Sequence, residues 1–399
     1  MSLYDKASIA LIPSGTKAST LYSVLPANGN GDFTHSRGST ATRVNKDGLI
    51  ESVAANVPRL DYPLTSGVVG DCPHLLLEPQ RTNSLTYSTL AFNGGATPTG
   101  WSVGFGTGTF SHTETTYKGQ GAVKHTQSTT GRSYLSETIS LSASTTYTLR
   151  VEFDRDNSSG IDDTDFIVAT ANMDNSFTKQ WSDVDDDGIL EVQFTTGTDA
   201  TGELRLGFGV SGNEDGGKTI VFSMPQIEQG SYATSYIPTT SATATRSADV
   251  CNDSGTSAEF NISEGVLFVE SAALADDLTI RQVTLNDGAT NTILIGYRTN
   301  SNRIYAQLIS NNVSQAFISY DVTDITEFHK IALKYSTNSV HLWIDGVKRA
   351  SDTSATMPLA LTDLDLQGTT GSAQFYAKTK QVIYFNEALT DSELATLTS

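Results

Sequence analysis

Alternation of apolar and polar residues along the middle of the chain predicts β-strands. From Tyr147 to Phe153 every second position is apolar, which is the period-two pattern of a strand with one buried face. Runs of the same kind occur at 134–141, 165–169, 189–194, 203–208 and 219–222. Gly, Asp and Asn clusters separate these runs, and such residues favour tight turns. The pattern predicts an antiparallel β-sandwich or jelly roll over residues 88–246.

The last part of the chain, residues 247–399, has a second strand-rich pattern with a clear turn signal. Asp345-Gly346 stands between two apolar runs, and Asp-Gly favours a type I′ hairpin because Gly accepts a positive φ at little cost. Near the end, Thr390 and Glu393 have the spacing of a capping box, and apolar leucines follow. We therefore expect a second antiparallel β-sandwich that ends in one short helix.

The first part, residues 1–87, has only short apolar segments between polar, Gly- and Asn-rich stretches such as 26–32. Such a segment buries too little apolar surface to offset its own ordering entropy. We expect it to fold against a neighbouring subunit or the next domain, and a small β-rich cap on the second domain is the alternative. Residues 238–246 are small and polar, which indicates a linker. The predicted fold class is all-β, with an extended attachment segment and two antiparallel β-sandwiches.

Composition narrows the classes of function. The chain has 25 basic and 44 acidic residues, a formal charge of −19. Such an acidic surface repels phosphate backbones, so nucleic acid is not an expected partner. We find no charged-then-apolar leader and no run of about 18 apolar residues. The sequence therefore predicts neither export by the general pathway nor membrane insertion.

The two cysteines, Cys72 and Cys251, are far apart in the sequence. This spacing is typical neither of a disulfide framework nor of a metal site. We expect two buried free thiols, with a long-range disulfide as the alternative.

Catalytic motifs are missing from the sequence. No serine stands on a Gly-flanked elbow, no phosphate-binding loop is present, and the six histidines lack the spacing of a zinc site. The Glu-x-Asp-x-x-Glu string of concanavalin-A-like hydrolases does not occur in residues 247–399. The prediction is a protein that is not an enzyme, and a polysaccharide depolymerase is an alternative.

One acidic turn has the pattern of a cation-binding loop. Asp183, Asp185 and Asp187 alternate before Gly188, as in the opening of a Ca²⁺ loop. The twelfth position is Phe194 rather than a bidentate Glu, which favours an ordinary acidic hairpin turn. Ca²⁺ is thus a candidate ligand, and no cofactor is predicted to be required.

Candidate sugar-binding residues combine aromatic rings with planar polar side chains, because sugar C–H faces stack while hydroxyls form hydrogen bonds. Trp181 beside the acidic turn is a candidate for an exposed platform. A second candidate group brackets a turn in the third part and consists of Tyr297, Arg298, Arg303 and Tyr305. Packing in the core or at a sheet edge is the alternative for each of them.

Several strings resemble virion proteins of tailed bacteriophages, of the kind called tail-fibre, head-fibre or minor structural proteins. The strings lie at 32–34, 43–51, 58–62, 75–83, 225–230 and 233–238. Residues 88–246 are similar to jelly-roll carbohydrate-binding modules. Residues 247–399 resemble laminin-G-like or concanavalin-A-like sandwiches through 328–335, Asp345-Gly346 and 385–391.

The resemblance implies a non-enzymatic virion protein, made in the host cytoplasm, whose sandwiches adhere to host-surface glycans. Its implied partners are other virion proteins and further copies of itself, commonly as a homotrimer. Capsid decoration or a tail adaptor without a glycan ligand is the alternative. The sequence leaves open head or tail location, host and the identity of the glycan.

Overall fold

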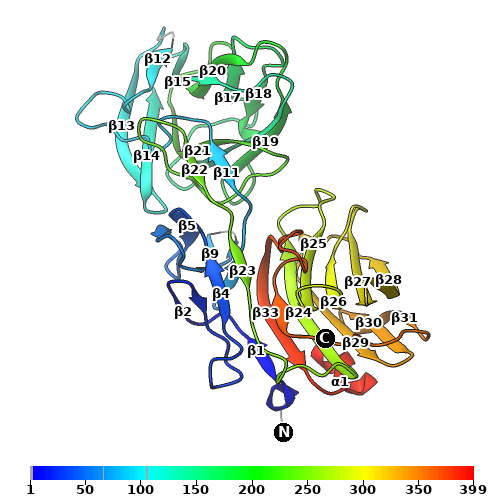
Figure 1. Cartoon of the computed structure of the whole chain (residues 1–399). Coiled ribbons are helices and arrows are strands. Elements are labelled where there is room, and N and C mark those ends of the chain that lie inside the picture. The colour runs from blue at the N-terminus through cyan, green and yellow to red at the C-terminus, as the bar shows by residue number, and fades with distance from the viewer. Residues whose placement is uncertain (1–2, 66, 105–106) are drawn as a thin grey trace.

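A computed structural model describes residues 3–65, 67–104 and 107–399. These residues are nearly all in strands, turns and loops, with one α-helix and two short 3-10 helices among them. The predicted all-β class is confirmed. Figure 1 shows a middle sandwich, a third-domain sandwich, and the N-terminal segment in blue running between them.

The middle sandwich consists of a seven-stranded and a five-stranded sheet. The larger sheet contains β11 (Arg81–Asn83), β13 (Phe110–Tyr117), β14 (Gln120–Gln127), β16 (Thr146–Phe153), β19 (Ile189–Thr195), β21 (Lys218–Gln229) and β22 (Ala244–Arg246). The smaller sheet contains β12 (Ser102–Gly104), β15 (Ser133–Ser140), β17 (Phe166–Ala171), β18 (Thr178–Gln180) and β20 (Thr201–Phe208). The alternate residues from Tyr147 to Phe153 are all buried, as their spacing predicts, and they join one apolar core between the sheets.

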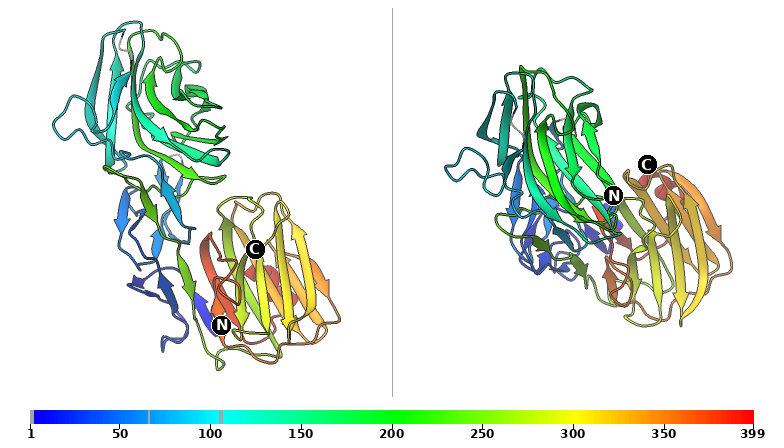
Figure 2. Two further views of the ribbon diagram at one scale, coloured as in Figure 1. Left: turned by 45° about the horizontal axis from the view of Figure 1, so that its top comes forward. Right: turned by 90° about the horizontal axis from the view of Figure 1, so that it is seen from above.

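The third-domain sandwich consists of an eight-stranded and a five-stranded sheet. The larger sheet contains β1 (Ile9–Leu11), β7 (Arg59–Asp61), β10 (His74–Leu76), β24 (Glu264–Ala273), β29 (His329–Ser336), β30 (Ser339–Ile344), β31 (Val347–Asp352) and β33 (Ala377–Phe385). The smaller sheet contains β25 (Arg281–Asn286), β26 (Thr292–Tyr297), β27 (Arg303–Ser310), β28 (Val313–Asp321) and β32 (Asp363–Asp365). The two sheets lie face to face in the views of Figure 2.

The N-terminal segment is built into the third domain. Its strands β1 and β10 both pair with β33, and β7 continues the sheet beyond β10. Ile9, Leu60 and Leu75 belong to the same apolar core as the third-domain strands. The segment thus gains the core that it lacks by itself mainly from the third domain, while its last residues, with β11 and Leu85, join the large sheet and the core of the middle domain.

The remaining strands of the segment form small sheets. They are β2 (Thr16–Lys17), β3 (Thr20–Leu21), β4 (Phe33–Ser36), β5 (Ala41–Val44), β6 (Ile50–Val53), β8 (Leu64–Thr65) and β9 (Val68–Val69). Strand β4 pairs with β23 (Val250–Asn252), which follows the predicted linker. Strand β22, within the predicted linker, pairs with β11, and Arg246 is buried. Residues 238–246 are therefore an ordered connection and not a free linker, because their backbone and Arg246 form hydrogen bonds with the first segment.

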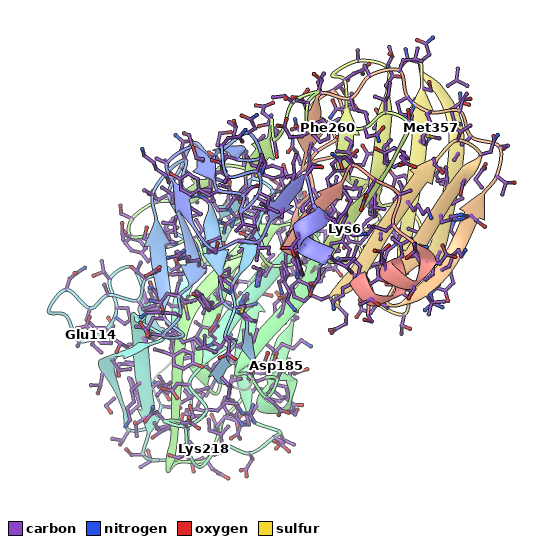
Figure 3. All side chains as sticks on the ribbon, turned by 90° about the horizontal axis from the view of Figure 1, so that it is seen from below. Lys6, Glu114, Asp185, Lys218, Phe260 and Met357 are labelled. Atoms are coloured by element: carbon purple, nitrogen blue, oxygen red, sulfur yellow. The ribbon has the colours of Figure 1, made fainter. Side chains whose placement is uncertain are left out.

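The local turn and cap predictions are confirmed. Asp345 and Gly346 both have positive φ between β30 and β31. The helix α1 (Asp391–Leu397) begins with a capping box between Thr390 and Glu393. Lys6, at the end of the 3-10 helix η1 (Leu3–Lys6) and labelled in Figure 3, pairs with Glu393 at 2.7 Å, which ties the two ends of the chain together.

Both cysteines are free thiols in the structure. Cys251 is buried as expected, but Cys72 is exposed, so the prediction of a second buried thiol is wrong. Cys72 lies in the loop before β10, where no apolar layer covers it. The described residues include no helix of the length and apolarity needed to cross a membrane.

Candidate functional site

The smaller sheet of the third domain has one face toward the core and one face away from it. Ile304, Ala306 and Ile318 point into the core. Because side chains alternate along a strand, Arg303, Tyr305 and Phe317 point to the other face. We call this the outer face of the third domain, and it contains three of the four residues predicted in this region.

Arg298 is the centre of an aromatic cluster on the outer face. Its guanidinium lies 5.2 Å from the ring centroid of Tyr305 and 4.9 Å from that of Phe317. The two rings are 5.7 Å apart. Phe317 is 44% exposed, whereas Tyr305 is only 2% exposed. The cluster therefore presents one partly open ring, Phe317, which is in contact with a second ring and a cation.

Polar groups surround the open ring. Gln282 donates a hydrogen bond to the Tyr305 hydroxyl at 2.6 Å, and Gln307, opposite Phe317 in the sheet, donates one to Ser314 at 3.0 Å. Burial raises the pKa of Tyr305, so its hydroxyl stays protonated. Amides and hydroxyls thus flank an apolar ring, as sugar recognition requires.

Arg303 and Asp321 form an ion pair on the same face. Two guanidinium nitrogens donate to the carboxylate at 2.6 and 2.8 Å. The hydrogen bond from Arg303 holds the pKa of Asp321 below its ordinary value. The pair is therefore charged at neutral pH and open to solvent at the edge strand.

Tyr297 does not belong to this surface. Its ring is 1% exposed and stacks on Phe375 in the core, and its hydroxyl lies 3.0 Å from Ser271. The prediction that it takes part in a sugar platform is wrong, because it occupies an inward position next to the outward Arg298. Sequence analysis missed Phe317, although the alternation with Ala316 and Ile318 places it outward.

The loop after β32 covers the other half of the outer face. Ala373 accepts a backbone hydrogen bond from Gln282, and the Thr369 hydroxyl lies 2.8 Å from that of Thr292. This loop buries Thr292 and Thr284 from above. The open part of the face is consequently restricted to β27 and β28.

Trp181 is buried, which corrects the prediction of an exposed platform. The ring is 8% exposed, packs edge-on against Phe153 at 5.8 Å, and has the Arg155 guanidinium 4.9 Å above it. Arg155 is held there by the carbonyls of Val184 and Asp185. The acidic turn thus supplies a cover for Trp181 and leaves no ring face for a sugar.

The carboxylates of that turn serve the turn itself. Asp183 pairs with Lys179 at 3.2 Å and accepts from the Gln180 backbone, and Asp185, labelled in Figure 3, accepts from the Ile189 backbone at 2.7 Å. Asp187 lies two residues further along, before the positive-φ Gly188. Among the described residues no group of three or more His, Cys, Asp or Glu is placed to hold a metal ion. The predicted Ca²⁺ ligands therefore do not converge. The alternative of a hairpin turn is also wrong, because β18 before the turn and β19 after it belong to different sheets.

A second cluster of charged residues lies where the N-terminal segment contacts the connection that follows the middle domain. We call it the arginine junction, and it consists of Arg37, Arg59, Glu78, Arg246 and Asp249. All five are nearly fully buried. Arg59 donates to Glu78 at 2.6 Å and also to Asp249, while Arg37 donates to Asp249 at 2.9 Å.

The arginine junction joins several of the strings that the sequence analysis singled out. Arg59 lies in 58–62, Glu78 in 75–83, and Ser235, which donates to Glu78 at 2.6 Å, in 233–238. Burial by itself would raise the pKa of Glu78, but the charges of Arg246 and Arg59 outweigh it and lower the pKa to about 2. The strings therefore encode a buried junction, in which each charged side chain has a partner of opposite charge.

No family model and no curated protein matches the chain. Among solved structures, the CBM40 of the Ruminococcus gnavus IT-sialidase bound to alpha2,3 sialyllactose is similar, at 11% identity over 35% of this chain and 84% of that chain, with a TM-score of 0.30. The leech intramolecular trans-sialidase has 15% identity over 35% of this chain and 23% of that chain, also at 0.30. The NanB sialidase of Streptococcus pneumoniae has 16% identity over 35% and 24%, at 0.30. TM-scores this low support no conclusion about the ligand of this chain.

Proposed function

We propose that this protein is a non-catalytic glycan-binding protein whose sugar site is the open part of the outer face of the third domain. The observation that supports this is Phe317, a large apolar ring left open on a sheet face and flanked by Arg298 and amide side chains. A sugar ring stacks its C–H face on such a ring, while its hydroxyls bond to the surrounding polar groups.

The setting that we propose is a tailed-phage particle, in which the chain is an appendage subunit that adheres to host-surface glycans. The support is the set of strings that resemble virion proteins. Three of these strings, 58–62, 75–83 and 233–238, meet in the arginine junction. Their residues connect the first segment to both sandwiches, which explains why the strings occur in one chain. A homotrimer is part of this proposal.

The test of sugar binding is a glycan array of bacterial surface polysaccharides, probed with the full chain. The Phe317→Ala variant removes the open ring, and Tyr22→Ala is the matched control because Tyr22 is an aromatic residue of similar exposure, 40%, in the first segment. We expect the array signal to fall for Phe317→Ala and to persist for Tyr22→Ala. Equal signals for both variants would overturn the outer-face site.

Two further measurements separate the alternatives. Reducing ends released from a bound polysaccharide would contradict the non-catalytic role and favour a depolymerase. Antibody labelling of intact particles in electron micrographs tests the virion role. Label on a fibre or tail tip is expected, whereas label over the capsid from a protein silent on the array would select decoration.

A further inference from the structure

The N-terminal segment and the two sandwiches enclose a cleft of about 800 Å³, away from the outer face of the third domain. Its lining includes Tyr62 and Thr65 from the first segment, Tyr117 from the middle domain, and Phe328 and Lys378 from the third. We infer that this cleft is a second binding site, and that its ligand is an uncharged oligosaccharide.

The cleft is held open by contacts on two sides. The hairpin between β13 and β14 docks on the first segment, where Ile50 donates to the Lys118 carbonyl at 2.9 Å and Gln120 donates to the Ile50 carbonyl at 2.8 Å. The arginine junction fixes the opposite side, and Glu78 and Ser235 line the cleft. Preformed walls lower the ordering cost of binding.

The floor of the cleft is the outer surface of the large third-domain sheet. Opposed residues on neighbouring strands share a face, and His74 opposes Asp61 while Leu76 opposes Lys378. All four line the cleft. The floor thus combines a carboxylate, an imidazole and an ammonium within one sheet.

His74 has unused hydrogen-bonding capacity at this floor. The side chain is 2% exposed, and neither ring nitrogen has a hydrogen-bond partner, although Nε2 lies 3.3 Å from Asp61. Phe328 packs edge-on against the ring with centroids 5.9 Å apart, and it is itself only half-buried. An imidazole nitrogen can form a hydrogen bond with a hydroxyl, so a ligand hydroxyl that displaces the Phe328 edge can pair with one of the two unpartnered nitrogens.

The charges of the walls favour an uncharged ligand. Lys118 pairs with Glu152 at 2.8 Å and Arg150 pairs with the same carboxylate at 2.9 Å. Burial opposes ionisation of Glu152, but the charges of Arg150 and Lys118 outweigh it and lower its pKa. The lining of the cleft contains nine acidic and six basic side chains, so a fixed negative charge on a ligand would meet more like charges than opposite ones. Hydroxyls both donate and accept, and the half-buried rings of Tyr62 and Tyr117 offer stacking surfaces.

The test uses tetrasaccharides of neutral hexoses, with tetrasaccharides of hexuronic acids as the charged comparison, observed by saturation-transfer NMR with the full chain. Thr65→Trp places a large ring at the exposed rim of the cleft. Thr113→Trp is the matched control, since Thr113 is an exposed strand residue of β13 outside the lining. We expect at least about ten-fold weaker binding of a neutral tetrasaccharide for Thr65→Trp and no change for Thr113→Trp.

The outcomes separate this site from the outer-face site. Phe317→Ala leaves cleft binding intact, and Thr65→Trp leaves outer-face binding intact, so either site can fail without the other. Absence of any neutral tetrasaccharide signal, or a signal insensitive to Thr65→Trp, overturns the cleft site. Binding of the uronic tetrasaccharides alone overturns the uncharged class.

Discussion

The arginine junction and the outer face of the third domain contain similar chemistry in opposite surroundings. In the junction, Arg59 and Glu78 are buried and pair at 2.6 Å. On the outer face, Arg303 and Asp321 pair at the same distance, but their side chains are 31% and 53% exposed. Two ion pairs of the same length should therefore differ in how much stability is lost when one partner is removed: much in the arginine junction and little on the outer face.

The two regions differ in whether water can solvate a charge whose partner has been removed. When one partner of a buried pair is removed, the other charge stays uncompensated in a medium of low polarity. At the surface, water solvates the remaining charge, so the pair is free to exchange its partner for a ligand. Burial thus assigns the junction to stability, and the exposure of the outer face agrees with the recognition role that we propose for it.

The largest expected effect is that of breaking the junction. Glu78→Gln removes the charge that compensates Arg59 and Arg246, and we expect a loss of about 3–5 kcal/mol in the free energy of unfolding. Denaturant titration measures it. Asp321→Asn breaks the exposed pair and is expected to change the unfolding free energy by less than about 1 kcal/mol. Equal losses for the two variants would contradict the distinction between the regions.

Acid is expected to weaken the junction in the same way. The pKa of Glu78 is lowered from 4.5 to about 2, so the native state favours the ionised form. Its stabilising contribution is therefore complete above the unfolded pKa and is lost as the pH falls from about 4.5 toward about 2. Unfolding free energies of the wild type and Glu78→Gln should converge over this range. A constant difference between them down to pH 2.5 would show that the Glu78 charge is not responsible.

On the outer face, a change should affect binding rather than stability. Phe317→Ala removes the open ring, and we expect roughly ten-fold weaker affinity for the best glycan on the array. The unfolding free energy should change by less than about 1 kcal/mol, because the side chain is 44% exposed. Calorimetric titration and denaturant titration measure the two quantities. A large stability loss with unchanged affinity would assign Phe317 to packing.

The smallest expected effect is that of the cation behind the rings. Arg298→Lys keeps the charge but loses the planar group that contacts both Tyr305 and Phe317, and we expect affinity to fall by about two- to five-fold. Arg349→Lys is the control, because Arg349 stacks on Tyr320 at 4.6 Å rather than on Phe317. A Lys variant that binds as well as the wild type would show that stacking of Arg298 is not needed.

Local signals in the sequence predicted the local structure well. The alternation from Tyr147 to Phe153 and the capping box at Thr390 depend on neighbours a few residues apart, and both are present in the structure. The partners of β1 and β10 could not be predicted this way. Ile9 lies opposite Tyr384, and no local pattern states which distant sheet a short strand joins.

The site was predicted only in part for a related reason. Arg298, Arg303 and Tyr305 were identified from composition around a turn, but their neighbour Tyr297 points inward. Trp181 looked exposed because it borders an acidic turn, while its cover, Arg155, is 26 positions earlier in the sequence. Exposure depends on such tertiary contacts, and the outward position of Phe317 was the one signal that alternation alone could have provided.

The most direct test of the outer-face site is a crystal structure of the full chain with the best glycan from the array. We expect a sugar ring stacked on Phe317, with a hydroxyl within hydrogen-bonding distance of Arg298 or Gln307. A sugar bound elsewhere, with Phe317 free of ligand, would contradict the proposed site.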